Sequence, residues 1–236
     1  MNAALPPRRF FRWAYAGLSL ALMLAGCSGD MIPAGKRISH RPPAARPSVS
    51  ARDDLVYRAD SAAFRQCAAQ LSAINVRYST LPDQSFGGGC TTYGAVKLID
   101  IGVQTSNLGA MTCPLATNFA AWARYGVQPA ARLILGSDVV RIETFGTYNC
   151  RTIASSTRLS EHAHGNAVDI SAFLLADGRR ISVTNGWNGD RQAAQFLRVV
   201  RASACKRFRT VLSPDYDPSH RDHLHFDMGG RGGYCR

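Results

Sequence analysis

The chain has 236 residues, of which 46% are hydrophobic and 19% are charged, and its formal net charge is +12 at pH 7. It is long enough to bury a sizeable core, and we find no internal repeat. The basic residues are not gathered in runs, so most of the charge is expected to be ordinary solvated surface that favours anionic partners.

Residues 1–26 predict a secretory signal peptide. Arg8, Arg9 and Arg12 precede an apolar run over residues 13–25, which is too short for a stable membrane span. The run ends in Leu-Ala-Gly-Cys, which resembles the bacterial lipobox. This resemblance implies cleavage before Cys27, lipidation of its sulfur and attachment to a membrane surface. Ser28 then favours the periplasmic face of the outer membrane; an ordinary signal peptide with a chance cysteine is the alternative.

Residues 27–54 predict a disordered tether, because they are rich in proline and arginine and have almost nothing apolar to bury. His40 lies in this segment and is expected to be solvated. Residues 55–236 then form one globular domain. An envelope lipoprotein with a basic domain is expected to meet an anionic envelope polymer, and no nucleic acid.

The spacing of apolar residues predicts an α+β domain with a central antiparallel sheet and flanking helices. Helices are expected at residues 59–73, 115–126, 128–135 and 190–208, the last capped by Asp190. A Gly-rich loop is expected at residues 84–90, and Asp177-Gly178 suits the turn of a hairpin. Strands are expected at residues 74–81, 95–104, 139–146, 167–175, 179–184, 210–213 and 223–228.

Six cysteines follow Cys27, an even number that argues for disulfides in an exported chain. None lies in a Cys-x-x-Cys motif, so a thiolate zinc site is not expected, and the spacing leaves the pairing open. The six are Cys67, Cys90, Cys113, Cys150, Cys205 and Cys235.

Five of the six histidines lie in two short clusters, within residues 160–169 and 220–227. Histidine and aspartate side chains brought together from separate segments are typical zinc ligands. On a strand, His223 and His225 would point to the same face, with Leu224 turned to the core. Asp169 stands between Val168 and Ile170 and would point to the face opposite theirs. The simpler alternative is a set of unrelated polar residues at loop and strand ends.

The motif Ser160-x-His162-x-x-Gly165-x-Ala167-x-Asp169, followed by the His-x-His of residues 223–225, resembles the zinc motifs of the M15/LAS metallopeptidases. These are D-Ala-D-Ala carboxypeptidases and murein endopeptidases. More closely, "LSEHAHGNAVDI", "TVLSPDYD", "DHLHFD" and the final "YCR" resemble the bacterial extensin-like C-terminal domain family over nearly all of residues 60–236. The resemblance implies a peptidase-like fold and zinc-dependent hydrolysis of amide bonds in peptidoglycan.

The resemblance also implies roles for single residues. His162, Asp169 and His225 would bind Zn²⁺, and Ser160 would orient a ligand by a hydrogen bond. His223 would be the acid/base in the pocket, and Arg151 would contact a substrate carboxylate.

The chain departs from the Glu-x-x-His members, because Asp222 stands where their glutamate base would be. The general base is therefore His223 or, second, His220 or Asp222. His164 is expected to face solvent, and Glu161 to face away from the metal. Two other classes stay open: a non-catalytic wall-binding lipoprotein, and a zinc nuclease, which lacks its expected Asn/His pattern here.

Overall fold

The computed structural model describes residues 58–236 of the chain. The signal peptide, Cys27, His40 and the tether predicted for residues 1–54 therefore lie outside the described residues. Among residues 58–236, no helix has both the length and the apolar character needed to cross a membrane.

A seven-stranded sheet is the centre of the fold, with the order β12–β10–β11–β8–β7–β5 and with β9 paired to β8. The pairs around β8 and β11 are antiparallel, as the sequence predicts, but the edge strands β5 and β12 pair in parallel. The strands are β5 (Gln104–Ser106), β7 (Val139–Gly146), β8 (Ala167–Leu175), β9 (Arg180–Ser182), β10 (Thr210–Leu212), β11 (Leu224–Asp227) and β12 (Tyr234–Cys235).

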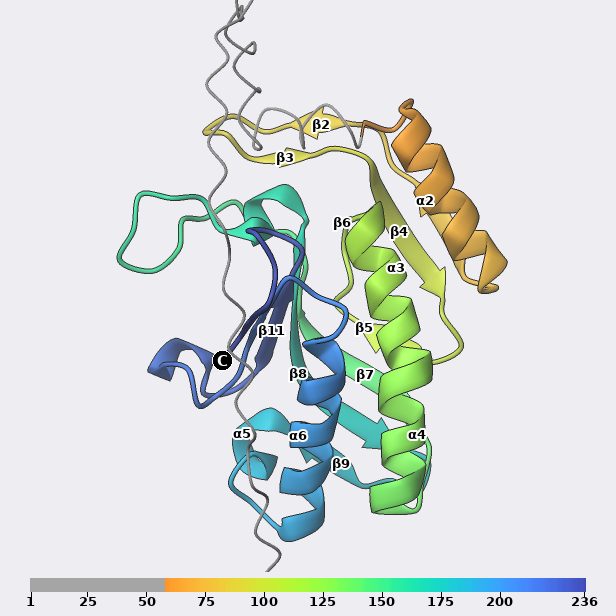
Figure 1. Ribbon diagram of the computed structural model, residues 1–236, viewed down its shortest axis with the longest axis vertical. Helices are drawn as coiled ribbons and strands as arrows, with labels where there is room; N and C mark the ends of the chain where they lie inside the picture. Colours follow the sequence, from red (N-terminus) through yellow and green to blue (C-terminus); the bar gives the residue numbers. More distant parts are fainter. Residues whose placement is uncertain (1–57) are drawn as a thin grey trace, which may run out of the picture. The chain divides into compact units, whose positions relative to one another are not determined.

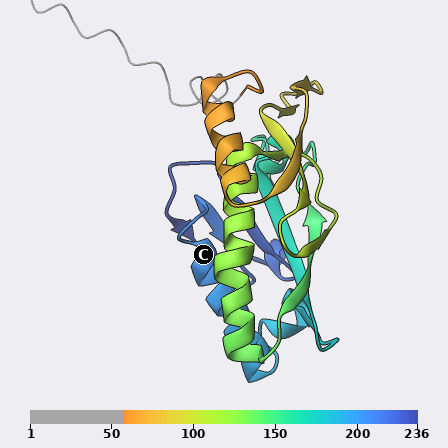
Figure 2. The same ribbon diagram turned by 90° about the vertical axis from the view of Figure 1, so that its right-hand side faces the viewer.

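Helices cover one face of this sheet (Figure 1). A long helical segment runs through α3, η1, α4 and η2, and Figure 2 shows it lying along the sheet. The other helices include α2, capped by Ser61, and α6, capped by Asp190 as predicted. The bounds are α2 (Ala62–Ala73), α3 (Cys113–Trp122), η1 (Ala123–Val127), α4 (Gln128–Ala130), η2 (Ala131–Leu135), η3 (Glu161–His164), α5 (Val183–Gly186), α6 (Arg191–Ala204) and η4 (Pro218–His220).

The two helices predicted for residues 115–126 and 128–135 are one continuous segment, so the predicted stop at Gly126 is wrong. A Cβ at Gly126 would collide with the Ser203 hydroxyl of α6, so this glycine permits close helix packing rather than ending a helix. Pro129 lacks an N–H, and π-type turns on both sides accommodate it. The segment ends at Gly136, which has a φ of 67°.

The strand predicted for residues 95–104 is also divided. Its first part, β4 (Ala95–Asp100), lies in a separate three-stranded sheet with β1 (Arg77–Thr80) and β6 (Met111–Thr112), whereas β5 joins the main sheet. The chain turns between them at Gly102, whose N–H donates to Asp100 Oδ1 at 2.9 Å. The glycines of the predicted Gly-rich loop connect β2 (Gln84–Ser85) to β3 (Thr91–Thr92), and these two strands pair with each other as a short antiparallel ribbon.

All six cysteines within residues 58–236 are paired. Cys67–Cys113 joins α2 to the start of α3, and Cys205–Cys235 joins the end of α6 to β12. Cys90–Cys150 joins the loop before β3 to the loop after β7. The disulfides therefore hold the outer elements and the C-terminus to the core.

The alternation of side chains along β8 and β11 separates the core from the site. Val168, Ile170, Leu224 and Phe226 are fully buried on the helix-covered side, where Trp122 meets the Phe226 ring at 5.0 Å between centroids. Because successive side chains point to opposite faces of a strand, the residues between them point to the other face.

Candidate metal centre

The strand register brings Asp169 and His225 together. They are cross-strand partners in the antiparallel pair β8–β11, so their side chains leave neighbouring strands on the same face. His225 Nδ1 lies 2.8 Å from Asp169 Oδ1. The partner of Asp169 on its other side is Gly146 of β7, which has no side chain to occupy this space.

His162 reaches the same point from the 3₁₀ turn η3, which directly precedes β8. The Ser160 hydroxyl accepts from the His162 backbone N–H at 3.3 Å, so it caps the turn, and it makes no hydrogen bond to the imidazole ring. Gly165, with a φ of 60°, ends the turn and redirects the chain into β8. The end of the turn, the left-handed Gly165, Asn166 and two strand residues therefore separate His162 from Asp169.

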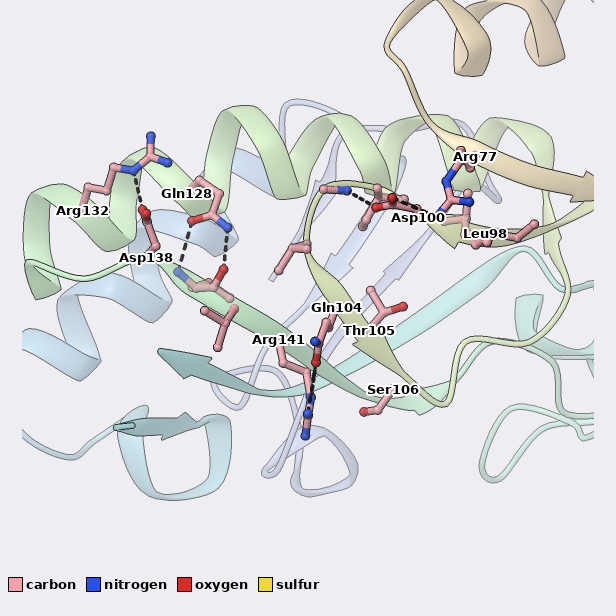
Figure 3. A pocket seen from close by; sticks show the side chains of 16 residues that line it. Arg77, Leu98, Asp100, Gln104, Thr105, Ser106, Gln128, Arg132, Asp138 and Arg141 are labelled. Carbon is pink, nitrogen blue, oxygen red and sulfur yellow. Dashed lines mark hydrogen bonds and ion pairs between the residues drawn. The ribbon is translucent and has the colours of Figure 1, made fainter. Parts of the chain in front are cut away.

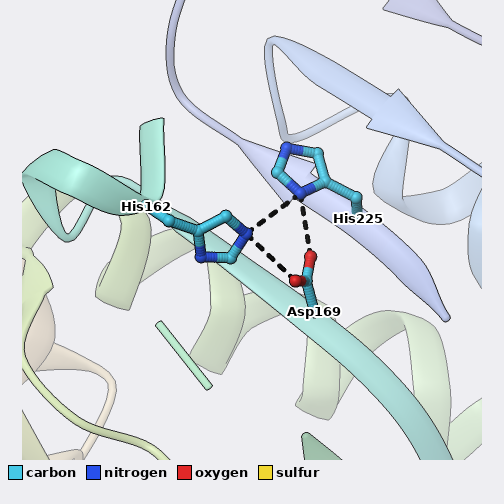
Figure 4. Close-up of side chains that lie close together, drawn as sticks. All are labelled: His162, Asp169 and His225. Atoms are coloured by element: carbon cyan, nitrogen blue, oxygen red, sulfur yellow. Dashed lines mark hydrogen bonds and ion pairs between the residues drawn. The ribbon is translucent and has the colours of Figure 1, made fainter. Parts of the chain in front are cut away.

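The three side chains form a compact, buried cluster (Figure 4). His162 Nε2 lies 3.2 Å from His225 Nδ1 and 3.1 Å from Asp169 Oδ2. In a tetrahedral zinc site with bonds of about 2.0–2.1 Å, ligand atoms stand about 3.3 Å apart. The donor set and its spacing thus fit a zinc ion bound by three protein ligands.

The ring nitrogens of His162 and His225 that point away from the cluster are also hydrogen-bonded. His162 Nδ1 donates to the Thr147 carbonyl at 2.8 Å, which leaves Nε2 as the acceptor that faces the cluster. His225 Nε2 lies 3.0 Å from Asp227 Oδ2, and Asp227 is itself buried. Asp227 is not among the residues predicted for the site, although its position two residues after His225 on the same strand puts it on the same face.

The charges of the cluster are strongly coupled. Burial alone would raise the pKa of Asp169, but the neighbouring imidazoles of His162 and His225 outweigh burial and hold that pKa far below its usual range. Burial alone would lower the pKa of His225, but the bonds to Asp169 and Asp227 raise it to about 9. Without a metal, a proton on His225 therefore compensates the carboxylates.

Two further histidines lie beside the cluster. His223 directly precedes β11, and its Nε2 is 3.6 Å from Asp169 Oδ1, while its Nδ1 is bonded to Asp222 at 2.8 Å. His220, in η4, is bonded to Asp217 at 2.8 Å, and its ring lies 5.1 Å from that of His223. Burial lowers the pKa of His220 despite the bond to Asp217, which favours its neutral form.

The remaining predicted residues lie outside the cluster of His162, Asp169 and His225. Arg151 is exposed, and its carbonyl accepts from the Ser160 N–H at 3.0 Å. The expectation that His164 faces solvent is wrong, because this residue is half-buried with Nδ1 3.0 Å from the Thr91 hydroxyl. The Glu161 carboxylate accepts from Asn166 Nδ2 at 2.6 Å and lies against Gly229.

One hollow of the described residues is lined by none of these histidines. It is an open groove of about 940 Å³ along β4, β5 and β7 (Figure 3). Its arginines are already engaged, as in the pairs Arg77–Asp100 and Arg132–Asp138. The groove therefore offers volume without the convergent donors that the histidine cluster has.

Comparison with known proteins gives one match. A protein-family model described as "Extensin-like protein C-terminus" matches residues 65–236. This range contains the histidine cluster and all six paired cysteines. No curated protein and no solved structure matches the chain significantly.

Proposed function

The chain belongs to the family of the extensin-like protein C-terminus, and from this premise we propose that it is a zinc metallopeptidase of the bacterial cell envelope. Its domain would be of the M15/LAS type and would hydrolyse amide bonds in the stem peptides or cross-links of peptidoglycan. The observation that carries the proposal is the buried convergence of His162, Asp169 and His225.

The donor set supports zinc over other common ions. Two imidazoles and one carboxylate suit Zn²⁺, whereas Mg²⁺ and Ca²⁺ prefer shells of oxygen ligands. Three protein ligands are typical of catalytic zinc sites, in which the metal polarises a carbonyl and acidifies water. The half-buried His223 and His220 supply groups for proton transfer beside the ligands.

His223 is the residue best placed to hold a proton. Its Nδ1 is engaged by Asp222, so the ring is fixed with Nε2 toward Asp169. The 3.6 Å between Nε2 and Asp169 Oδ1 is longer than a hydrogen bond. His223 thus presents one ring nitrogen to the site while a carboxylate orients the other, the arrangement that general acid–base catalysis uses.

The proposed location follows from the N-terminal sequence. A lipid on Cys27 would hold the domain in the envelope, where a basic surface meets an anionic polymer. Metabolic labelling with a clickable fatty acid tests this directly. The full chain is expected to take up label, and Cys27→Ala is expected to lose it; equal labelling of both would refute the anchor.

A second function is favoured by one observation. The position of the Glu-x-x-His glutamate is occupied by Asp222, whose carboxylate is bonded to His223. A chain with the metal site but without a competent base would bind peptidoglycan without cleaving it. The second candidate is therefore a non-catalytic wall-binding lipoprotein with the same fold.

Two measurements on the full chain separate these functions. Elemental analysis after dialysis is expected to find one zinc per chain, and none in His162→Ala. Digestion of purified sacculi, followed by chromatography and mass spectrometry of the products, is expected to show new peptide termini. His223→Ala is the matched variant: it should keep the zinc and lose most of the cleavage.

The outcomes differ for each function. Zinc uptake with sacculus binding but without new termini would support the non-catalytic candidate. If the wild-type chain binds no zinc and His162→Ala is equally stable, the metal site itself is refuted.

A further inference from the structure

We propose that Asp227 is a positioning residue that fixes which nitrogen of His225 faces the metal. This inference rests on the proposed zinc site and adds to it a fourth residue, which is not a ligand. It also assigns the binding atoms: Nε2 of His162 but Nδ1 of His225.

The carboxylate of Asp227 has two bonds, one for each oxygen. Oδ2 lies 3.0 Å from His225 Nε2, and Oδ1 accepts from the Gly229 N–H at 2.8 Å. Since an ionised carboxylate can only accept, Nε2 of His225 must carry a proton. Without a metal, Nδ1 faces the Asp169 carboxylate in the same way, so the doubly protonated ring bonds to both carboxylates. A metal held by Asp169 and His162 would displace only the Nδ1 proton, because Nδ1 points at those two residues while Nε2 stays bonded to Asp227.

The geometry holds the proton on Nε2 of His225 firmly. Asp227 and His225 are two residues apart on β11, so both side chains leave the strand on the same face. Both are buried, and β8 and β10 flank the strand on its two sides. Little solvent can therefore replace the carboxylate as the acceptor for Nε2–H.

The neighbouring histidine shows the opposite arrangement. Asp222 is bonded to Nδ1 of His223, which turns Nε2 of that ring toward the site. One short segment thus presents Nε2 of His223 and Nδ1 of His225 to the same place. The position of each aspartate along the chain decides which nitrogen is presented.

The substitution Asp227→Asn separates positioning from simple packing, because it keeps the size of the side chain and removes one acceptor. The single amide oxygen can serve either Gly229 N–H or His225 Nε2–H. If it serves Gly229, the amide NH₂ faces His225 and favours the tautomer with a proton on Nδ1, which cannot bind metal. If the amide oxygen accepts from His225 Nε2–H, the amide NH₂ faces the Gly229 N–H, and two donors then oppose each other.

The first experiment measures the zinc affinity of the full chain by competition with a chromophoric chelator. Asp227→Asn is expected to bind zinc about 10- to 100-fold more weakly than the wild type. Asp222→Asn is the matched control, since it makes the same change on a histidine that is not a ligand, and its affinity should stay within about twofold. Equal affinities for Asp227→Asn and the wild type would overturn the inference.

The second experiment needs no variant. In ¹⁵N-labelled wild-type chain loaded with ¹¹³Cd, the metal should couple to Nδ1 of His225 and Nε2 of His162, with a protected proton on Nε2 of His225. Coupling to Nε2 of His225 would overturn the inference while leaving the metal site intact. A wild-type chain that takes up neither metal would refute both.

Discussion

We expect His225 to make the metal-free chain sensitive to alkaline pH. Burial alone would lower its pKa, but the bonds to Asp169 and Asp227 raise it from 6.5 to about 9. A group whose pKa is raised by folding contributes stability below its unfolded pKa, and the contribution is lost as the pH rises through the folded pKa. With a chelator present, the chain should therefore lose stability between about pH 6.5 and 9.

The size of this loss follows from the shift. One pKa unit corresponds to about 1.4 kcal/mol, so His225 contributes on the order of 3 kcal/mol to the free energy of unfolding. The lowered pKa of Asp169 describes partly the same contact from the carboxylate side, so it is not added. Its own effect appears at acidic pH, where stability falls as the pH drops below about 4.

Denaturant unfolding at pH 6 and pH 9.5, with chelator, measures the effect. Other groups titrate in this range, so the comparison is with His225→Gln, which lacks the imidazole. The wild type is expected to lose on the order of 3 kcal/mol more than the variant between the two pH values. The reasoning is refuted if both chains lose the same amount.

Zinc should reverse the dependence of stability on pH, because the metal binds Nδ1 of His225 in place of a proton. At pH 7.5, zinc binding is expected to release about one proton from His225. Calorimetry in two buffers of different ionisation enthalpy detects it. Binding without proton release would show that His225 is neutral before the metal arrives.

Three further predictions concern the scaffold. Gly165→Ala, at a φ of 60°, should cost about 1–2 kcal/mol and weaken zinc binding, whereas Gly178→Ala, at 87°, should cost a similar amount without affecting zinc; chelator competition decides, and equal zinc affinities would count against the role of the turn. Trp122→Ala should cost about 3–5 kcal/mol in denaturant unfolding, because the buried ring contacts Phe226 and its Nε1 donates to Val200. Replacing the Cys90–Cys150 pair by alanines should cost about 2–5 kcal/mol by the same measurement.

The tryptophan and disulfide predictions also have controls. Tyr125→Ala, on the exposed side of the long helical segment, should change stability by no more than about 0.5 kcal/mol. A loss as large as that of Trp122→Ala would mean that burial does not explain the difference. For the disulfide, the control is reductant, which opens the Cys90–Cys150 bond of the wild type. The difference in the free energy of unfolding between the wild type and the double variant should therefore shrink when reductant is present.

Much of the fold was predictable where short-range pattern decides it. The alternation of Val168 and Ile170 around Asp169 predicted a strand with a polar face, and Asp190 predicted the start of α6. Errors arose where a distant contact overrides the local signal. Gly126 indicates a helix end by its propensity, but packing against Ser203 keeps the helix continuous.

From the sequence by itself, strand alternation predicted the faces of Asp169, His223 and His225, because successive side chains on a strand point to opposite sides. The resemblance of its motifs to known zinc motifs implied the set His162, Asp169 and His225. Only the tertiary structure decided how they meet: the register of β8 with β11 sets Asp169 beside His225, and the carbonyl of Thr147 and the carboxylate of Asp227 select the nitrogens that face the cluster. It also paired the six cysteines and divided the strand at Gly102. These features depend on contacts between segments far apart in the chain, which residue spacing does not encode.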